Sequence, residues 1–122
     1  PAPLQVPRWN GGRMPLTTLL SDAVLDLVSG HSDTRVAASP EFKAVAPLLN
    51  VQKRWSRLPD RDTLLIERWK GRDGDHAFVF PFAGRLVHEG LASLVAWRLA
   101  QRKPSTFTLA FNDWGFEVAG ND

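Results

Sequence analysis

The chain has 122 residues, of which 43% are hydrophobic, and a formal net charge of +2. This length fits one domain or part of one, and the hydrophobic fraction can fill a core, which excludes wholesale disorder. The absence of cysteine excludes a disulfide framework and a thiolate zinc site. No apolar run approaches the roughly 20 residues that span a bilayer, so no membrane partner is expected. A first residue other than methionine favours a piece of a longer protein.

The chain is predicted to be a single domain whose first part, residues 1–58, is a mainly helical lead-in. Residues 1–15 are rich in proline and glycine, which is typical of irregular structure. Apolar residues then recur at helical spacing over residues 18–29. Thr17 can cap the start of this helix, and Gly30 stands where a glycine commonly ends one.

A second helical region is expected after Ser39 and Pro40, because a polar cap followed by proline is a common helix start. Pro47 should interrupt this region, since proline removes a hydrogen bond inside a helix. We therefore predict a short first turn and then a second helix from Pro47 to about Arg57. Its buried stripe is expected to contain Leu48, Val51 and Trp55.

Residues 59–122 are predicted to form a ββαββ unit. Alternating patterns indicate strands over residues 63–70 and 76–82, a helix covers 86–102, and a last hairpin follows Pro104. The expected fold class is therefore α+β: N-terminal helices, then an antiparallel hairpin, a helix and a second hairpin. The strands would form a small β-sheet or a partial barrel, and the alternating residues Phe78, Phe80 and Phe82 are expected in its core.

The helix over residues 86–102 is apolar around most of its circumference, so it is expected to be covered on more than one face. Its main stripe comprises Val87, Leu91, Leu94, Val95 and Leu99. A separate seam of small residues comprises Ala92, Ala96 and Ala100. Arg98 falls within the main stripe, where it either reaches out to solvent or pairs with a carboxylate such as Glu67 or Glu117.

No motif for catalysis or metal binding is present, so neither catalytic residues nor metal ligands are expected. His88 and Glu89 begin like a zinc-protease helix, but the second histidine is replaced by Ala92. His88 could contact phosphate together with Arg85, or it could simply be solvated or hydrogen-bonded at the helix start. We favour the second interpretation.

Two stretches alternate basic residues with tryptophan, Lys53–Arg57 and Arg68–Arg72. Arginine and lysine bind phosphates, and exposed indoles stack on unpaired bases. Spacing favours burial of Trp55 and leaves Trp69 open between core and surface. Trp9 suits either stacking or interdomain docking. The candidate DNA-binding residues are Trp9, Arg13, Arg54, Arg57, Arg68, Lys70, Arg72 and Arg85.

Four segments resemble one family. They are Trp9–Leu16 (WNGGRMPL), Leu64–Arg68 (LLIER), Phe78–Ala92 (FVFPFAGRLVHEGLA) and Asn112–Glu117 (NDWGFE). The chain resembles the ligase-associated DEXH-box helicases, of the large helicase-related type, in their C-terminal DEAD/H-associated domain. Trp69 and Trp114 depart from this pattern, since less bulky residues are expected there.

The resemblance implies a non-catalytic accessory domain of an ATP-dependent 3′-to-5′ DNA helicase or translocase involved in repair. No cofactor is expected in this fragment, because ATP and magnesium would bind the motor domains of the parent. The implied partners are single-stranded or forked DNA and the parent's own motor and winged-helix domains. The implied location is the bacterial cytoplasm, at the nucleoid. The alternative is a structural scaffold that packs against those domains without touching DNA. A free-standing enzyme has no motif in its favour.

Overall fold

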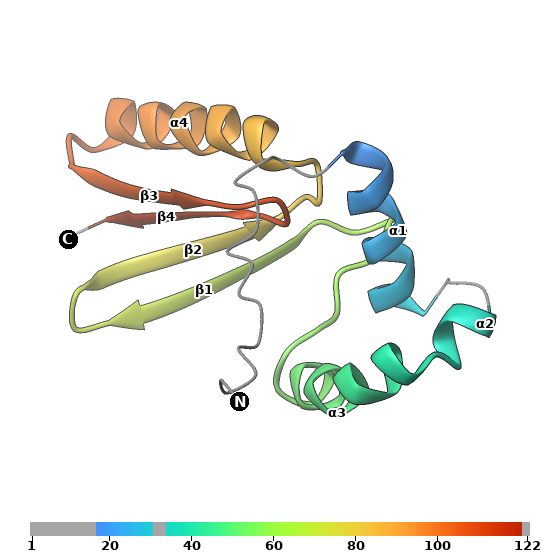
Figure 1. Ribbon diagram of the computed structural model, residues 1–122. Helices are drawn as coiled ribbons and strands as arrows, with labels where there is room; N and C mark the ends of the chain where they lie inside the picture. The colour runs from blue at the N-terminus through green and yellow to red at the C-terminus, as the bar shows by residue number, and fades with distance from the viewer. Residues whose placement is uncertain (1–16, 31–33, 121–122) are drawn as a thin grey trace, which may run out of the picture.

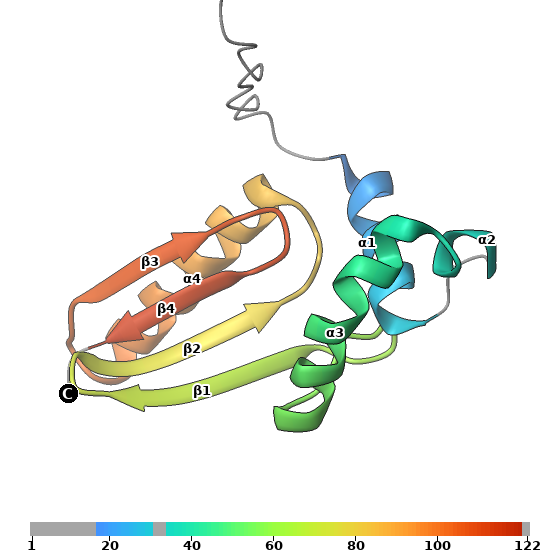
Figure 2. The same cartoon turned by 60° about the horizontal axis from the view of Figure 1, so that its bottom comes forward.

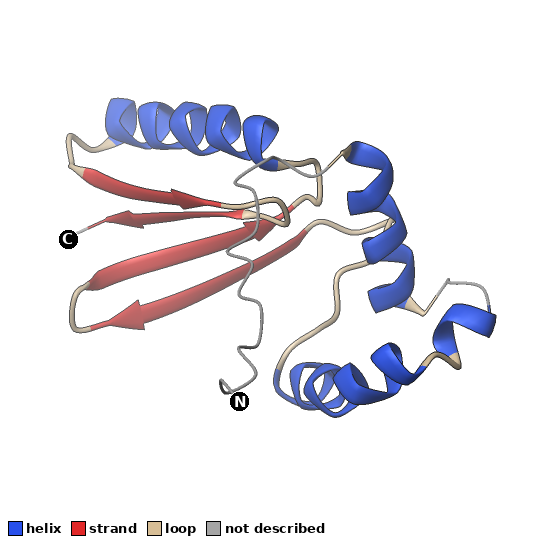
Figure 3. Ribbon diagram, in the orientation of Figure 1, coloured by secondary structure: helices blue, strands red, loops and turns tan. Residues whose placement is uncertain are grey.

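The computed structural model describes residues 17–30 and 34–120, and it confirms the α+β class (Figure 1). Three helices precede an open, four-stranded antiparallel sheet of order β1-β2-β4-β3, and a fourth helix lies between its two hairpins (Figure 3). The elements are α1 (Thr18–Ser29), α2 (Thr34–Ala37), α3 (Pro40–Trp55), β1 (Leu65–Gly71), β2 (Gly74–Phe80), α4 (Arg85–Arg102), β3 (Phe107–Phe111) and β4 (Phe116–Gly120).

Helix α1 begins and ends where its capping residues predict. The Thr17 side chain accepts a hydrogen bond from the backbone N–H of Leu20, at 3.3 Å. Gly30 has a φ of 86°, a left-handed conformation that favours glycine, and its N–H bonds to carbonyls of the last turn. Both ends are therefore fixed by local chemistry.

Helix α3 corrects two predictions. It is one continuous helix from Pro40 to Trp55 with Pro47 inside it, not a short turn followed by a second helix. Pro47 lies on an exposed part of the helix, where water can bond the backbone carbonyl that proline leaves without a partner. The predicted stripe is also wrong, since Leu48 is 70% and Trp55 83% exposed. The less exposed stripe is displaced by a position and comprises Phe42, Ala46, Leu49 and Gln52.

The first hairpin is displaced from its predicted position. Strands β1 and β2 pair as far as Gly71 and Gly74, so that only Arg72 and Asp73 form the turn. Consequently β2 ends at Phe80, and Phe82 leaves the strand with a φ of 53°. The backbone N–H of Phe82 donates to the carbonyl of Trp114 at 3.1 Å, and the two rings pack with centroids 5.7 Å apart. These contacts hold the bulky side chain in a strained backbone conformation.

Helix α4 lies over β3 and β4 on one face of the sheet, as the two views show (Figures 1 and 2). Ala92 is fully buried and packs with Phe116 and Val118 in the core of this layer. The alanine seam is therefore the face that meets the sheet, because small side chains let the helix backbone come close. The expectation that α4 is covered on more than one face is wrong for the described residues: Leu86, Val87, Leu94 and Leu99 are exposed.

Candidate nucleic-acid interface

The two faces of the sheet differ in composition because strand residues alternate between them. On the α4 side, Val79 packs against the core, and its cross-strand partner Ile66 points the same way. Arg68 and Lys70 follow at intervals of two and therefore share that face. Since α4 lies over β3 and β4, this part of the face is left beside the helix rather than under it.

Three cations surround a groove of about 350 Å³ on this part of the sheet. Arg68 comes from β1, Arg102 from the last turn of α4, and Lys103 from the residue after it. Apolar side chains, among them Phe107 and Val118, line the same hollow. We call the site formed by Arg68, Arg102 and Lys103 the basic groove.

The carboxylate in the basic groove has a cationic partner of its own. Asp75 lines the groove, and its Oδ1 lies 4.0 Å from Nζ of Lys70. Lys70 stands next to Arg68 on the same face of β1. The charge at the groove is therefore positive overall, which suits an anionic ligand.

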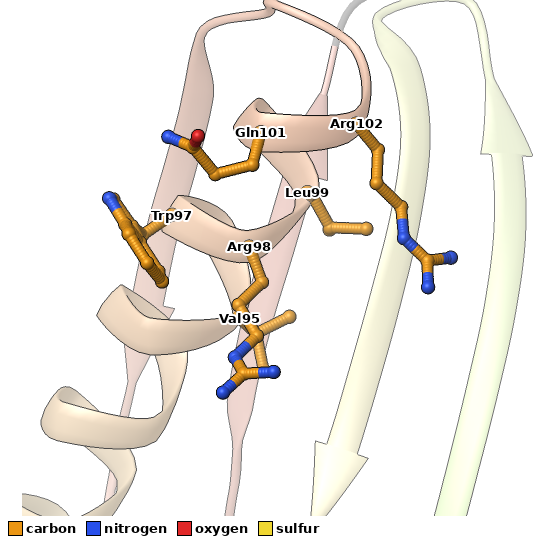
Figure 4. A pocket seen from close by; sticks show the side chains of 6 residues that line it. All are labelled: Val95, Trp97, Arg98, Leu99, Gln101 and Arg102. Atoms are coloured by element: carbon orange, nitrogen blue, oxygen red, sulfur yellow. The ribbon is translucent and has the colours of Figure 1, made fainter.

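A second hollow, of about 530 Å³, lies on the surface of α4 and is formed by that helix (Figure 4). Trp97 and Arg102 point to opposite sides of the helix, and Arg98 extends along it (Figure 4). Arg98 is exposed, which agrees with the predicted alternative in which it reaches out to solvent. The proposed partners are engaged elsewhere, because Glu67 accepts hydrogen bonds from Gln52 and Ser56, and Glu117 bonds His76.

The structure brings together only part of the predicted set. Arg68 and Lys70 share the groove face, and Arg72 lies in the turn that ends β1. Arg85 is at the other end of α4, about 25 Å from Arg102 at 1.5 Å per residue. Its guanidinium lies 5.6 Å from the centroid of the Phe111 ring.

The remaining candidates lie elsewhere. Arg54 and Arg57 are exposed at the end of α3. Gln52 and Ser56 there bond Glu67, whose side chain is on the opposite face of β1 from Arg68. Trp9 and Arg13 fall outside the described residues.

Arg102 and Lys103 were not among the residues predicted to bind DNA. Arg98 and Arg102 are four residues apart on one helix, and Lys103 follows directly. That cluster of three cations at a helix end was the signal that could have found them. No tryptophan is interleaved among the three, which is why the basic–aromatic pattern did not select them.

His88 is a structural residue, and the phosphate-contact alternative is wrong. Its side chain is fully buried, with Nδ1 donating to the Asn112 carbonyl at 2.6 Å. Nε2 accepts from the backbone N–H of Ala83 at 3.0 Å. The Asn112 side-chain oxygen in turn accepts from the N–H groups of Trp114 and Gly115, each at 2.9 Å. His88 thus joins the FAGRLVHEG segment to the NDWG turn.

The face opposite α4 carries a row of rings. The Trp69 and His76 centroids are 4.9 Å apart, and His76 is parallel to Phe78 at 6.1 Å. Of the three phenylalanines expected in the core, Phe82 is buried as predicted, whereas Phe78 and Phe80 are half-buried on this face and outside the core under α4. A hydrogen bond from His76 Nδ1 to Glu117, 2.6 Å long, raises the pKa of His76, and Asp73 raises it further.

Among residues 17–30 and 34–120, no group of three or more histidine, aspartate or glutamate side chains is arranged to hold a metal ion. None of the helices in this part of the chain is long and apolar enough to cross a membrane.

The family model described as DEAD/H associated matches residues 58–122, which is more than half of the chain. This match covers the whole hairpin–helix–hairpin unit and with it the basic groove. Comparisons with curated proteins and with solved structures found no match. The chain belongs to the DEAD/H associated family, whose members are accessory domains of DEAD/H-box helicases.

Proposed function

We propose that this domain binds the phosphates of single-stranded or forked DNA in its basic groove, on behalf of a helicase motor on the same polypeptide. The observation that carries the proposal is the convergence of Arg68, Arg102 and Lys103 from two separate elements around one groove. Phosphate contacts of this kind position a strand without reading its sequence. They suit a domain that must follow DNA of any sequence.

The remaining parts of the proposal rest on the resemblance of the four sequence segments to the ligase-associated DEXH-box helicases. The parent protein uses ATP and magnesium in its own motor domains, moves 3′ to 5′ along DNA and acts in repair in the bacterial cytoplasm, at the nucleoid. This domain supplies no catalytic group and works in cis beside the motor and a winged-helix domain.

The number of cations sets the expected salt dependence. Neutralising three phosphates of a single strand gives a slope of log K against log [salt] of about −2, at roughly −0.7 per contact. Affinity should therefore fall roughly 20-fold between about 50 and 200 mM salt. Affinity of the isolated domain is expected to be weak, because only a few phosphates are held.

The test is fluorescence anisotropy of labelled oligo(dT) with three chains: wild type, the double variant Arg68→Ala/Arg102→Ala, and Arg85→Ala as a matched control. The double variant should have a slope near −0.7, while Arg85→Ala keeps the wild-type slope because it lies at the far end of α4. Circular dichroism checks that each chain is folded. Salt-independent binding, or a double variant with the wild-type slope, would contradict the proposal.

A structural scaffold is the second candidate, and one observation favours it. Leu86, Val87, Leu94 and Trp97 are exposed on α4, which suits a helix that is covered by another domain. In the full-length parent, Leu94→Ser/Trp97→Ser should then weaken the thermal stability of the whole protein and leave strand binding by the basic groove intact. In the parent protein, charge reversal at Arg68 and Arg102 separates the candidates further. Lost unwinding with normal ATPase activity and folding favours DNA contact, and aggregation favours the scaffold.

A further inference from the structure

Trp69 is held flat against the sheet by the residue that follows it on the same face. Gly71 has no Cβ, and a methyl group there would collide with Cη2 and Cζ3 of the Trp69 indole. The indole therefore lies directly over the backbone of Gly71. Its outer surface is open, since Trp69 is 55% exposed.

Neighbouring groups fix the orientation of the indole. His76, directly opposite on β2, packs against it with centroids 4.9 Å apart and ring planes at 47°. His76 is itself held by Glu117 at 2.6 Å and Asp73 at 3.4 Å. A ring that is oriented before binding loses little conformational entropy when a planar ligand stacks on it.

The carboxylates near the indole each have a partner. Glu117 and Asp73 both face His76, and Glu67, two residues before Trp69 on the same face, accepts hydrogen bonds from Gln52 and Ser56. Arg72 is exposed in the adjoining turn. An uncharged planar group can therefore approach Trp69, with a cation nearby for its phosphate.

The position of β1 connects the indole to the basic groove. β1 is an edge strand, as its place at the end of the order β1-β2-β4-β3 shows. Arg68 and Lys70 point to the groove side of this edge and Trp69 to the other side. A single strand that follows the edge can place phosphates on one side of β1 and a base on the other.

From this juxtaposition we infer that the indole of Trp69, seated on Gly71, is a stacking site for an unpaired base of the strand held in the basic groove. The inference rests on the proposed function and adds a second contact to it. Stacking needs no particular base, because every base has a π face. The site distinguishes unpaired from paired bases, since a base inside a duplex has no free face.

The test compares Trp69→Ala, Trp69→Phe and the control Trp97→Ala, whose indole is 59% exposed on α4. Each is titrated with oligo(dT) and with an abasic strand of equal length. Trp69→Ala should weaken oligo(dT) binding by about 5- to 150-fold, the range for loss of one aromatic stack. Trp69→Phe and Trp97→Ala should stay near wild type, and the salt slope should not change. On the abasic strand all four chains should bind alike.

Equal affinity of wild type and Trp69→Ala for oligo(dT) overturns the inference, and so does an equal loss on the abasic strand. If binding depends on Trp69 but not on salt, the proposed phosphate binding in the basic groove is wrong, whereas stacking on Trp69 still holds. A wild-type chain that binds neither strand overturns both. Should Trp69→Ala fail to fold, a chain with Trp9, Trp55, Trp97 and Trp114 changed to Phe keeps Trp69 as its single tryptophan and provides another readout. Oligo(dT) must then quench its fluorescence, and an unchanged spectrum contradicts the inference.

Discussion

Replacing His88 with alanine should destabilise the domain strongly. The side chain is fully buried and bonds two backbone groups, the N–H of Ala83 and the carbonyl of Asn112. A buried polar group without a partner costs about 1–3 kcal/mol. Asn112 is exposed, so water can partly replace the imidazole at its carbonyl, and the lower end of the range applies there. Together with the cavity left beside Phe116, the expected loss is about 3 kcal/mol.

That loss is a large share of the roughly 5–15 kcal/mol by which a small domain is stable. Urea unfolding followed by circular dichroism measures it. His88→Gln keeps one donor and one acceptor and should recover part of the loss, while Glu89→Ala, an exposed change on the same helix, should have little effect. A free energy of unfolding for His88→Ala within about 1 kcal/mol of wild type would contradict this prediction, because losing two buried hydrogen bonds should cost more.

Three further predictions concern local structure. Pro47→Ala should raise far-UV helicity and stabilise the chain by about 1–2 kcal/mol, because it restores a hydrogen bond inside α3; equal or lower helicity contradicts this. The Glu117 bond raises the pKa of His76, so its stabilisation is complete below the unfolded pKa of 6.5 and is lost as pH rises through the raised folded value. As pH rises over that range, the urea midpoint of wild type should therefore fall relative to that of Glu117→Gln. If the midpoints of the two chains change with pH in parallel, this prediction is wrong. Gly71→Ala should displace the Trp69 indole, shift its fluorescence and cost about 1–3 kcal/mol, whereas an unchanged spectrum would show that the ring does not lie there.

The fold class was predictable because its signals are local. Thr17 and Gly30 define α1 through hydrogen bonds within a few residues of each other. The hairpin–helix–hairpin order follows from alternation in the strands and from turn residues such as those of the NDWG segment. Displacements of the strand ends arise because pairing between β1 and β2 extends right up to the two-residue turn, and pairing is a property of both strands.

The buried face of α4 was not predictable from its own residues. Apolar side chains surround most of the helix, so the pattern alone does not choose a face. The choice is made by the sheet, which accepts Ala92 at closest approach and leaves Leu94 exposed. The bond from His88 to Asn112 joins residues 24 apart along the chain, and no local pattern reports such a pair.

Only part of the basic groove was predicted: Arg68 was a candidate, whereas Arg102 and Lys103 were not. The stretch from Arg68 to Arg72 reads as one basic–aromatic motif, but a strand sends neighbouring side chains to opposite faces. Arg68 therefore joins Arg102 and Lys103 at the groove, while Trp69 joins His76 on the other side. The end of α4 and β1 are distant in sequence, and they come together only through the tertiary fold.

The basic groove follows from the sizes of the two layers. A helix is about 10 Å wide and strands are about 4.8 Å apart, so one helix covers about two strands. The sheet has four strands, and α4 lies over β3 and β4. The face of β1 and β2 beside the helix is then open unless a further element covers it, and on β1 it carries Arg68 and Lys70 next to the exposed Ile66. An uncovered face that is basic, next to a helix end that is also basic, is better suited to hold an anionic strand than to pack against an apolar neighbour.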